Sequence, residues 1–166
     1  MQKKYLILVL ITLLVIIHLS QRSNEIILSD LPSPPIFSES EITRIRLTKQ
    51  GTTVELRQSG KTWHTEQNNL PIATSDINSL IDTITNLKIV MLISDHSNYS
   101  IFGLDQINRI TVEAYNEDRL LTRFQIGSTG PSRVHTFILL DNDPKVYYAN
   151  NCIRPLFESA IADIAP

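Results

Sequence analysis

The sequence predicts an α+β domain in which two amphipathic helices cover one face of a mainly antiparallel sheet, preceded by an N-terminal transmembrane helix. Three observations support this fold class. From residue 41 onward, most segments alternate apolar and polar side chains with the period of a half-buried strand. Two segments, 74–87 and 153–164, instead space their apolar side chains along one face of a helix. Residues 5–19 are apolar at nearly every position, which is typical of a segment buried in lipid.

Residues 1–20 are expected to form a signal anchor, which is a transmembrane helix that stays on the protein. Lys3 and Lys4 precede the fifteen-residue apolar run from Tyr5 to Leu19. Such a run spans about 22 Å, short of the roughly 30 Å hydrocarbon core, and Lys4 can reach the lipid boundary to make up the difference. A cleaved signal is the second interpretation, disfavoured because small residues are missing at the cleavage positions. A buried soluble helix is the third, and such a helix would carry a polar face.

The charge pattern gives the expected topology. Lys3 and Lys4 remain cytoplasmic by the positive-inside rule, so the chain after residue 20 emerges on the far side. Residues 21–40, with three prolines among serines, are expected to form an extended tether. Residues 41–166 then form one extracytoplasmic domain. We therefore expect a single-pass protein of the inner (cytoplasmic) membrane with a periplasmic C-terminal domain.

Composition excludes several classes of protein. Beyond residue 24 the chain keeps 12 of its 15 basic side chains and all 17 acidic ones, a net charge of −5. Such an acidic domain is a poor partner for nucleic acid, so none is expected. Cys152 is the only cysteine, which excludes a disulfide framework. The domain must therefore be held together by its apolar core.

The first half of the domain is predicted to contain three strands, a helix and a fourth strand. Alternation over 44–57 indicates a hairpin, and Trp63 is the inward residue of a short third strand. Thr74 or Ser75 is expected to cap the helix. The run 89–93 is apolar throughout, which predicts a strand buried on both faces. The helix carries its apolar residues at helical spacing: Ile77, Leu80, Ile81, Ile84 and Leu87.

The second half repeats this plan with a longer strand region. Ile107-Asn108-Arg109-Ile110 resembles Ile42-Thr43-Arg44-Ile45, which leaves two interpretations open, an internal duplication or a chance similarity. Gly127–Pro131 is expected to break the strand pattern, and Asn150 or Asn151 to cap the final helix. Alternation predicts strands at 109–114 and 120–126, and a further pair of strands is expected at 134–140 and 145–149, around the turn at 141–144.

The chain shows no catalytic or metal-binding constellation. Its histidines are separated in the sequence and form no close pair of the kind that binds a metal on a strand, so neither a metal nor a cofactor is expected. Gly127-Ser128-Thr129-Gly130 lacks the spacing of a nucleophile elbow or a phosphate loop and is interpreted as a strand connection. Cys152 is interpreted as a half-buried packing residue. We therefore expect a protein that is not an enzyme.

One set of motifs has family character. The segment Tyr99–Asp105, the strand end Phe124-Gln125-Ile126-Gly127, the pair Val146-Tyr147 and the early Trp63 resemble an uncharacterised bacterial family of membrane-anchored domains. The resemblance covers residues 41–160. Members of that family are often encoded beside gliding-motility-type ABC transporter components. The resemblance implies a transmembrane anchor, an extracytoplasmic α+β domain and no catalytic residues.

Within this resemblance, Phe102-Gly103-Leu104-Asp105 is the candidate site. Gly103 permits a tight bend, Phe102 and Leu104 can anchor it to the core, and Asp105 can accept hydrogen bonds from backbone N–H groups. These properties favour a structural turn. A partner-binding turn is the alternative.

The function expected from these observations is a non-enzymatic, membrane-anchored accessory domain that binds a membrane or envelope protein, as part of an ABC-type transport or envelope assembly. The alternative is a domain that binds a small glycan or lipid ligand in a cleft between the helices and the sheet. A remote alternative is an envelope hydrolase, which would require His64, His96 or His135 to meet a carboxylate or Cys152.

Overall fold

The computed structural model describes residues 31–95 and 98–164. The signal anchor predicted at 1–20 and the first half of the predicted tether lie outside these residues. The chain from Leu31 to Pro166 forms one compact unit. Neither α-helix in the described part of this unit has the length and apolar character that a membrane span requires.

The described residues contain two α-helices, two short 3-10 helices and eight strands. The helices are η1 (Glu39–Glu41), α2 (Thr74–Thr85), η2 (Tyr99–Phe102) and α3 (Arg154–Ile164). The strands are β1 (Arg44–Lys49), β2 (Thr52–Ser59), β3 (Thr62–Thr65), β4 (Ile89–Ser94), β5 (Ile110–Asn116), β6 (Arg119–Thr129), β7 (Thr136–Leu140) and β8 (Val146–Ala149).

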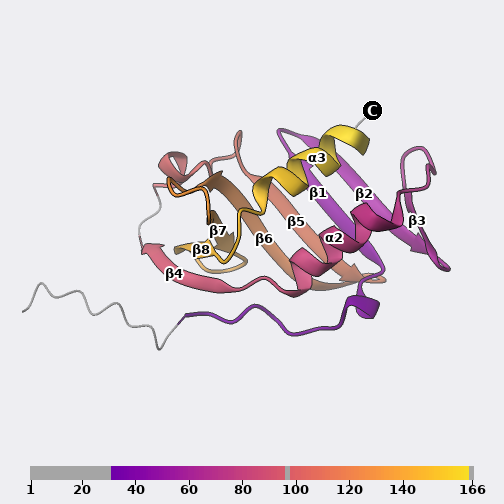
Figure 1. Cartoon of the computed structure of the whole chain (residues 1–166), viewed down its shortest axis with the longest axis horizontal. Helices are drawn as coiled ribbons and strands as arrows, with labels where there is room; N and C mark the ends of the chain where they lie inside the picture. Colours follow the sequence, from indigo (N-terminus) through magenta and orange to yellow (C-terminus); the bar gives the residue numbers. More distant parts are fainter. Residues whose placement is uncertain (1–30, 96–97, 165–166) are drawn as a thin grey trace, which may run out of the picture. The chain divides into compact units, whose positions relative to one another are not determined.

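The eight strands form one sheet in the order β3-β2-β1-β5-β6-β7-β8-β4, and every neighbouring pair is antiparallel (Figure 1). This confirms the predicted antiparallel sheet with two helices. β1 and β5, which open the two predicted halves, lie side by side, with Leu47 opposite Val112. From this pair, β2–β3 and β6–β7 extend in opposite directions across the sheet. Internal duplication itself stays a prediction.

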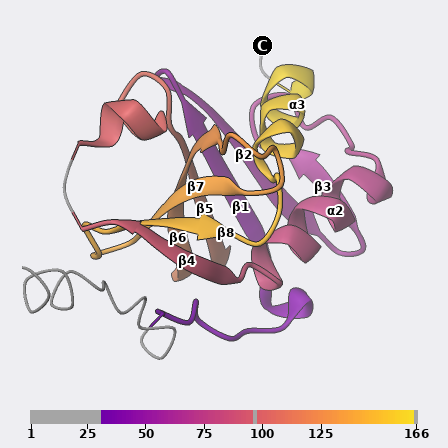
Figure 2. The ribbon, with the colours of Figure 1, turned by 60° about the vertical axis from the view of Figure 1, so that its left-hand side comes forward.

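Both α-helices pack on one face of the sheet, as the sequence predicts (Figure 2). The expected stripe of α2 is buried, with Ile77 and Leu80 each 1% exposed, and Phe157 of α3 is fully buried. Alternate residues of the strands meet these helices, so each strand contributes every second side chain to the main core. The strand residues of this main core are Ile45, Leu47, Val54, Leu56, Trp63, Ile110, Val112, Ala114, Phe124, Ile126, Ile138, Tyr147 and Ala149.

A second, smaller core lies on the reverse face at the β7–β8 end. It consists of Leu104, Phe137, Leu139 and Val146, and we call it the reverse-face cluster. Figure 2 shows that η2 and its following turn lie on the opposite side of the sheet from α2 and α3. β7 is therefore apolar on both faces, because Ile138 points to the main core and its two neighbours point to the reverse-face cluster.

The predicted caps of both helices were wrong. α2 begins after Ala73, and no side chain caps it. α3 begins at Arg154, too far along the chain for Asn150 or Asn151 to stand at its N-cap. Its start is held instead by a distant hydroxyl, because Thr136 of β7 accepts the Ile153 N–H at 2.9 Å and donates to the Asn151 carbonyl at 3.0 Å.

Two strand predictions need correction. The segment at 89–93 is a strand, but it is not buried on both faces, because β4 forms an edge of the sheet and Leu92 is 44% exposed. β6 does not end at Ile126 but continues to Thr129 through a register shift opposite β7. Gly127 is therefore a strand residue and not the start of a loop.

The chain before β1 runs along the domain. Leu31 and Phe37 pack against the main core, and Leu31–Ile36 line a shallow cavity together with Thr85–Ile89. The second half of the predicted tether is thus part of the compact unit that starts at Leu31.

Candidate functional site

The reverse face of β2, β1, β5 and β6 carries a continuous polar surface, which we call the open face. Both α-helices lie on the other side of these strands (Figure 2). Alternation along each strand places its polar residues here, opposite the apolar residues of the main core. The open face consists of Arg44, Arg46, Thr48, Thr53, Glu55, Arg57, Thr111, Glu113, Tyr115, Arg123 and Gln125.

Glu113 lies at the centre of the open face and is only 9% exposed. Its carboxylate accepts hydrogen bonds from Arg123 Nε at 2.7 Å, the Tyr115 hydroxyl at 3.0 Å and Arg46 Nη1 at 3.4 Å. These three donors come from three different strands, since Glu113 is opposite Arg46 on one side and Arg123 on the other. The nearly buried carboxylate of Glu113 thus has three donors. This pairing is needed because removing an unpaired charge from water would be costly.

Glu55 on β2 extends this network to the adjacent strand. It accepts hydrogen bonds from Arg44 Nη1 at 3.2 Å and Arg46 Nε at 3.1 Å. The two guanidinium groups also lie over the Tyr115 ring, with Cζ atoms 4.4 Å and 5.5 Å from its centre. Arg46 therefore bridges Glu55 and Glu113 across three strands.

The pKa shifts follow from this pairing. Burial alone would raise the pKa of Glu55, but the hydrogen bonds and charges of Arg46 and Arg44 outweigh it and hold this pKa below its usual value. The hydrogen bond to Glu113 raises the pKa of Arg123. Burial, together with the hydrogen bond to Glu113, raises the pKa of Tyr115. Glu55 therefore remains charged and the Tyr115 phenol remains neutral at neutral pH.

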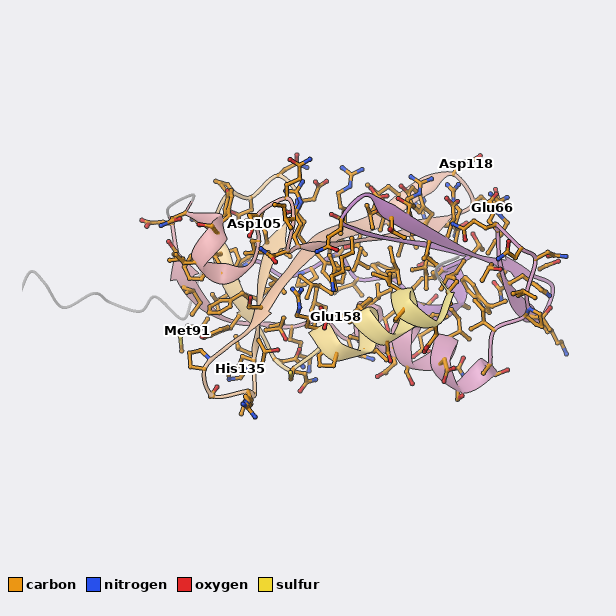
Figure 3. The ribbon with its side chains drawn as sticks, turned by 90° about the horizontal axis from the view of Figure 1, so that it is seen from above. Glu66, Met91, Asp105, Asp118, His135 and Glu158 are labelled. Carbon is orange, nitrogen blue, oxygen red and sulfur yellow. The ribbon has the colours of Figure 1, made fainter. Side chains whose placement is uncertain are left out.

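The predicted turn Phe102–Asp105 lies on the same side of the sheet as the open face. Figure 3 shows Asp105 and Asp118 on the side away from Glu158 of α3. Leu104 is fully buried in the reverse-face cluster, and the Phe102 ring lies 5.0 Å from that of Phe137. The four residues thus form one packed turn at the β7 side of the sheet.

Asp105 stabilises the chain that follows the turn. Its Oδ1 accepts the N–H groups of Ile107 and Asn108 at 3.0 Å and 3.2 Å, and its Oδ2 accepts the Asn108 side chain at 2.8 Å. The Asn108 hydrogen bond is the largest cause of the lowered pKa of Asp105. These bonds use the carboxylate within the loop, which is the geometry of a structural turn.

Two glycines allow the turn to approach β6 closely. Gly103 has a left-handed backbone with φ +63°, and a Cβ there would collide with Ser128. A Cβ on Gly127 would collide with the carbonyl of Phe102 and with Leu104. A glycine inside a strand indicates a close backbone approach, and this signal in the sequence could have placed the turn against β6.

The residues required by the hydrolase alternative are not brought together within the described residues. His135 Nδ1 lies 3.1 Å from the Ala149 carbonyl, and its ring packs on Tyr148. Cys152 is exposed, which corrects the half-buried position expected for it, and its Sγ lies 3.5 Å from Thr129 Oγ1. In residues 31–95 and 98–164, no three His, Cys, Asp or Glu side chains are grouped as a metal site. His96 lies outside the described residues.

The space between the helices and the sheet, where the alternative function would place a small ligand, is filled by the main core. A groove of about 430 Å³ lies instead at the surface, where α2, α3 and residues 70–73 meet. Leu70 and Leu156 line it, with Asp76 and Asp163 among the polar residues. It is an open surface groove rather than an enclosed cleft.

The sequence contains a signal for the open face that the prediction did not use. Arg44 and Arg46, which point outward from β1, are basic, whereas Glu55 of β2 and Glu113 of β5 are acidic. The two acidic strands would repel each other as neighbours, so the charges favour a position of β1 beside each of them. What the sequence does not provide is the pairing of β1 with β5, in which Arg46 lies opposite Glu113, 67 positions further along the chain.

Comparison with known proteins gives one match. A family model described as "Domain of unknown function (DUF4340)" matches residues 63–165, which is more than half of the chain. The match begins at Trp63, later than the residue 41 at which the resemblance above begins. It includes Glu113, Tyr115 and Arg123 of the open face and excludes β1 and β2. No curated protein and no solved structure matches the chain.

Proposed function

Because the chain belongs to the DUF4340 family, a domain of unknown function, we propose a role that rests on its surface: it is a non-enzymatic accessory domain that binds a protein partner through the open face. In this proposal residues 1–20 anchor the chain in the inner membrane, and the domain from Leu31 onward is extracytoplasmic. The partner is a membrane or envelope protein, and the two belong to an ABC-type transport or envelope assembly.

One observation carries the proposal. The open face spans four strands, neither α-helix covers it, and its charged groups are held in fixed positions by one another. Arg and Tyr are enriched in protein interfaces and among the residues that dominate binding energy. Side chains already fixed by ion pairs lose little conformational entropy when a partner binds, which favours affinity.

The charge pattern indicates the chemistry of the partner. Arg44, Arg46 and Arg123 alternate with Glu55 and Glu113, so the face offers both signs at spacings set by the strands. A matching surface would present acidic groups near the arginines and hydrogen-bond donors near the glutamates. Such a mixed surface disfavours a polyanion, in agreement with the expectation that nucleic acid is not a partner.

The test is purification of the full chain from detergent-solubilised membranes, with the R46A variant and a matched control. Lys49 lies on the same strand as Arg46 and is also ion-paired, but it points to the helix side, where its Nζ lies 2.7 Å from Glu158. Wild type and K49A should retain the same stoichiometric membrane protein, and R46A should lose it. Equal recovery from R46A and K49A, or recovery of the chain alone from wild type, would contradict the proposal.

A second candidate function, binding of a small glycan or lipid fragment, is favoured by the groove between α2 and α3. Leu70 is 57% exposed at its rim. A ligand there should protect Leu70 and Leu156 from solvent, which NMR chemical shifts of the full chain would report. Shifts confined to the open face would instead support the first proposal.

A further inference from the structure

The outer edge of β4 exposes apolar side chains toward both faces of the sheet. β4 pairs with β8 on one side, and no further strand of the described residues lies beyond it. Val90, Met91 and Leu92 are consecutive and are 37%, 43% and 44% exposed. Consecutive strand residues point to opposite faces of a sheet, so the exposure of all three means that neither face is covered here. The apolar strip therefore wraps around the edge of the sheet.

The segment before η1 extends this apolar strip. Figures 1 and 2 both show the segment beside β4, and Leu31–Ile36 line a shallow cavity together with Thr85–Ile89. Leu31 and Phe37 pack against the main core, but Ile36 is 99% exposed. Packing within the domain therefore does not account for an isoleucine at this position. We call the exposed apolar residues of the two segments the edge patch, which consists of Ile36, Val90, Met91 and Leu92.

The two segments that form the edge patch carry no acidic side chain. Residues 31–38 and 83–94 contain none of the 17 acidic residues of the chain, and their only charged residue is Lys88, which is exposed. The chain beyond residue 24 has a net charge of −5, so these segments are a local exception. Apolar side chains can enter the boundary between lipid headgroups and acyl chains, while a lysine beside them reaches the headgroup phosphates.

The length of chain before Leu31 keeps the edge patch near the membrane. The predicted anchor ends at residue 20, and the compact unit begins at Leu31. The ten residues between them span at most about 36 Å. Such a short tether makes any further contact with the membrane intramolecular, with an effective concentration in the millimolar range. A few apolar side chains and one lysine are then sufficient for a contact that would be weak for a free domain.

We propose that the edge patch rests on the lipid surface of the membrane. This inference rests on the anchor of the function proposed above, and it adds the face by which the domain meets the bilayer. Lipid fits the patch better than a partner strand does, because residues 31–36 already lie beside the start of β4 and such a strand would have to displace them. The edge stays at headgroup depth, where water still satisfies its backbone N–H and C=O groups.

This contact fixes the direction in which the open face points. With β4 at the membrane the sheet stands on its edge, and β3 is the strand farthest from the lipid. Neighbouring strands are about 4.8 Å apart, so the strands of the open face, β6 to β2, lie roughly 15–30 Å from β4. The open face then points along the membrane, where the extracytoplasmic part of a neighbouring membrane protein can reach it.

Spin labels on the full chain in lipid nanodiscs test the contact. The discs contain phosphatidylcholine and phosphatidylglycerol, and the background is C152S because Cys152 is exposed. A nitroxide at I36C or M91C should collide more often with oxygen, which concentrates in lipid, than with a water-soluble nickel complex. E66C is the control and should show the reverse. Glu66 is exposed, follows β3 at the opposite edge of the sheet, and lies at the far end of the domain from Met91 (Figure 3).

Charge reversal tests the contribution of the headgroups. In the same discs, K88E should shift the M91C nitroxide from oxygen toward the nickel complex, because a carboxylate beside the patch is repelled by phosphatidylglycerol. K61E is the matched control, since Lys61 is also exposed but lies in the turn between β2 and β3, and it should leave the M91C nitroxide unchanged. Equal effects of K88E and K61E would contradict the contact.

The spin-label measurement separates failure of this proposal from failure of the anchor. A chain that does not enter the nanodiscs would contradict the anchor and, with it, the contact of the edge patch. A chain that enters them but gives the same ratio of oxygen to nickel collisions at I36C and M91C as at E66C would overturn the contact alone. Exclusion of both reagents from M91C would mean that protein covers the edge patch, and would overturn the proposal as well.

Discussion

Replacement of Gly103 by alanine tests whether the Phe102–Asp105 turn is docked on β6. Gly103 has φ +63°, and so does Gly60 in the β2–β3 hairpin, but a Cβ on Gly60 meets nothing within 4 Å. G60A therefore reports the cost of a left-handed alanine alone, about 1 kcal/mol of unfolding free energy. Both changes replace glycine by alanine, so their effects on the unfolded chain cancel in the comparison.

G103A carries the same backbone cost and a collision in addition. The new Cβ would overlap Ser128 Oγ and approach the Ser128 backbone N to 3.0 Å. The side chain can rotate, but the backbone of β6 cannot move without disturbing its pairing. Overpacking of this kind costs about 1–3 kcal/mol, so the total for G103A should be about 2–4 kcal/mol.

Urea unfolding of the full chain in detergent, followed by the fluorescence of Trp63, measures both variants. Trp63 is the only tryptophan and is 6% exposed, so its emission reports the main core. S128G should recover part of the loss in G103A and none in G60A. Equal losses in G103A and G60A would refute the docking of the turn on β6.

Further outcomes concern the reverse-face cluster, the ion pairs and the main core. L104A should lower the unfolding free energy by about 2–5 kcal/mol in the same urea assay, because Leu104 is fully buried, and a loss below about 1 kcal/mol would contradict its role as anchor. Glu55 has a lowered pKa in the folded chain, so its contribution is complete above its unfolded pKa of roughly 4.3 and is lost as the pH falls through the folded value. Wild type should therefore lose stability below about pH 4 more steeply than E55Q, and parallel pH profiles would exclude the contribution. F157A should cost about 3–5 kcal/mol, and a smaller loss would mean that α3 packs loosely on the sheet.

Most of the strands and both α-helices followed from residue periodicity because each of them has one buried face. Ile45 and Leu47 alternate with arginines, and Ile77 and Leu80 lie one turn apart, so local spacing alone predicts their elements. The same reasoning gave the wrong burial for β4. An edge strand and a central strand can have the same apolar composition, and only the position in the sheet decides which of them is covered.

The positions at which some helices and strands begin or end depend on contacts between residues that are far apart in the sequence. The start of α3 is held by Thr136, 17 residues before Ile153, so a search for a local cap found the nearby asparagines instead. β6 likewise extends through Gly127, where the Phe102–Asp105 turn packs against it. In both cases a long-range contact outweighs local propensity.

In the candidate site, too, some features follow from the local sequence and others depend on distant contacts. The composition of the turn was sufficient to predict how Gly103 and Asp105 are used. The open face was not predicted, because Arg46 and Glu113 become neighbours only through the pairing of β1 with β5. Alternation indicates which side chains share a face of a strand. The order of the strands decides which of these side chains become neighbours, and periodicity carries no information about that order.

Site-specific photo-cross-linking in native membranes tests the central claim most directly. Thr53 is an exposed residue of the open face, and Ser79 is an exposed residue of α2 on the opposite side of the sheet. A photoreactive amino acid at Thr53 should capture the same membrane or envelope protein that co-purifies with wild type, and the same group at Ser79 should not. Capture of that protein from Ser79 with none from Thr53 would contradict binding through the open face.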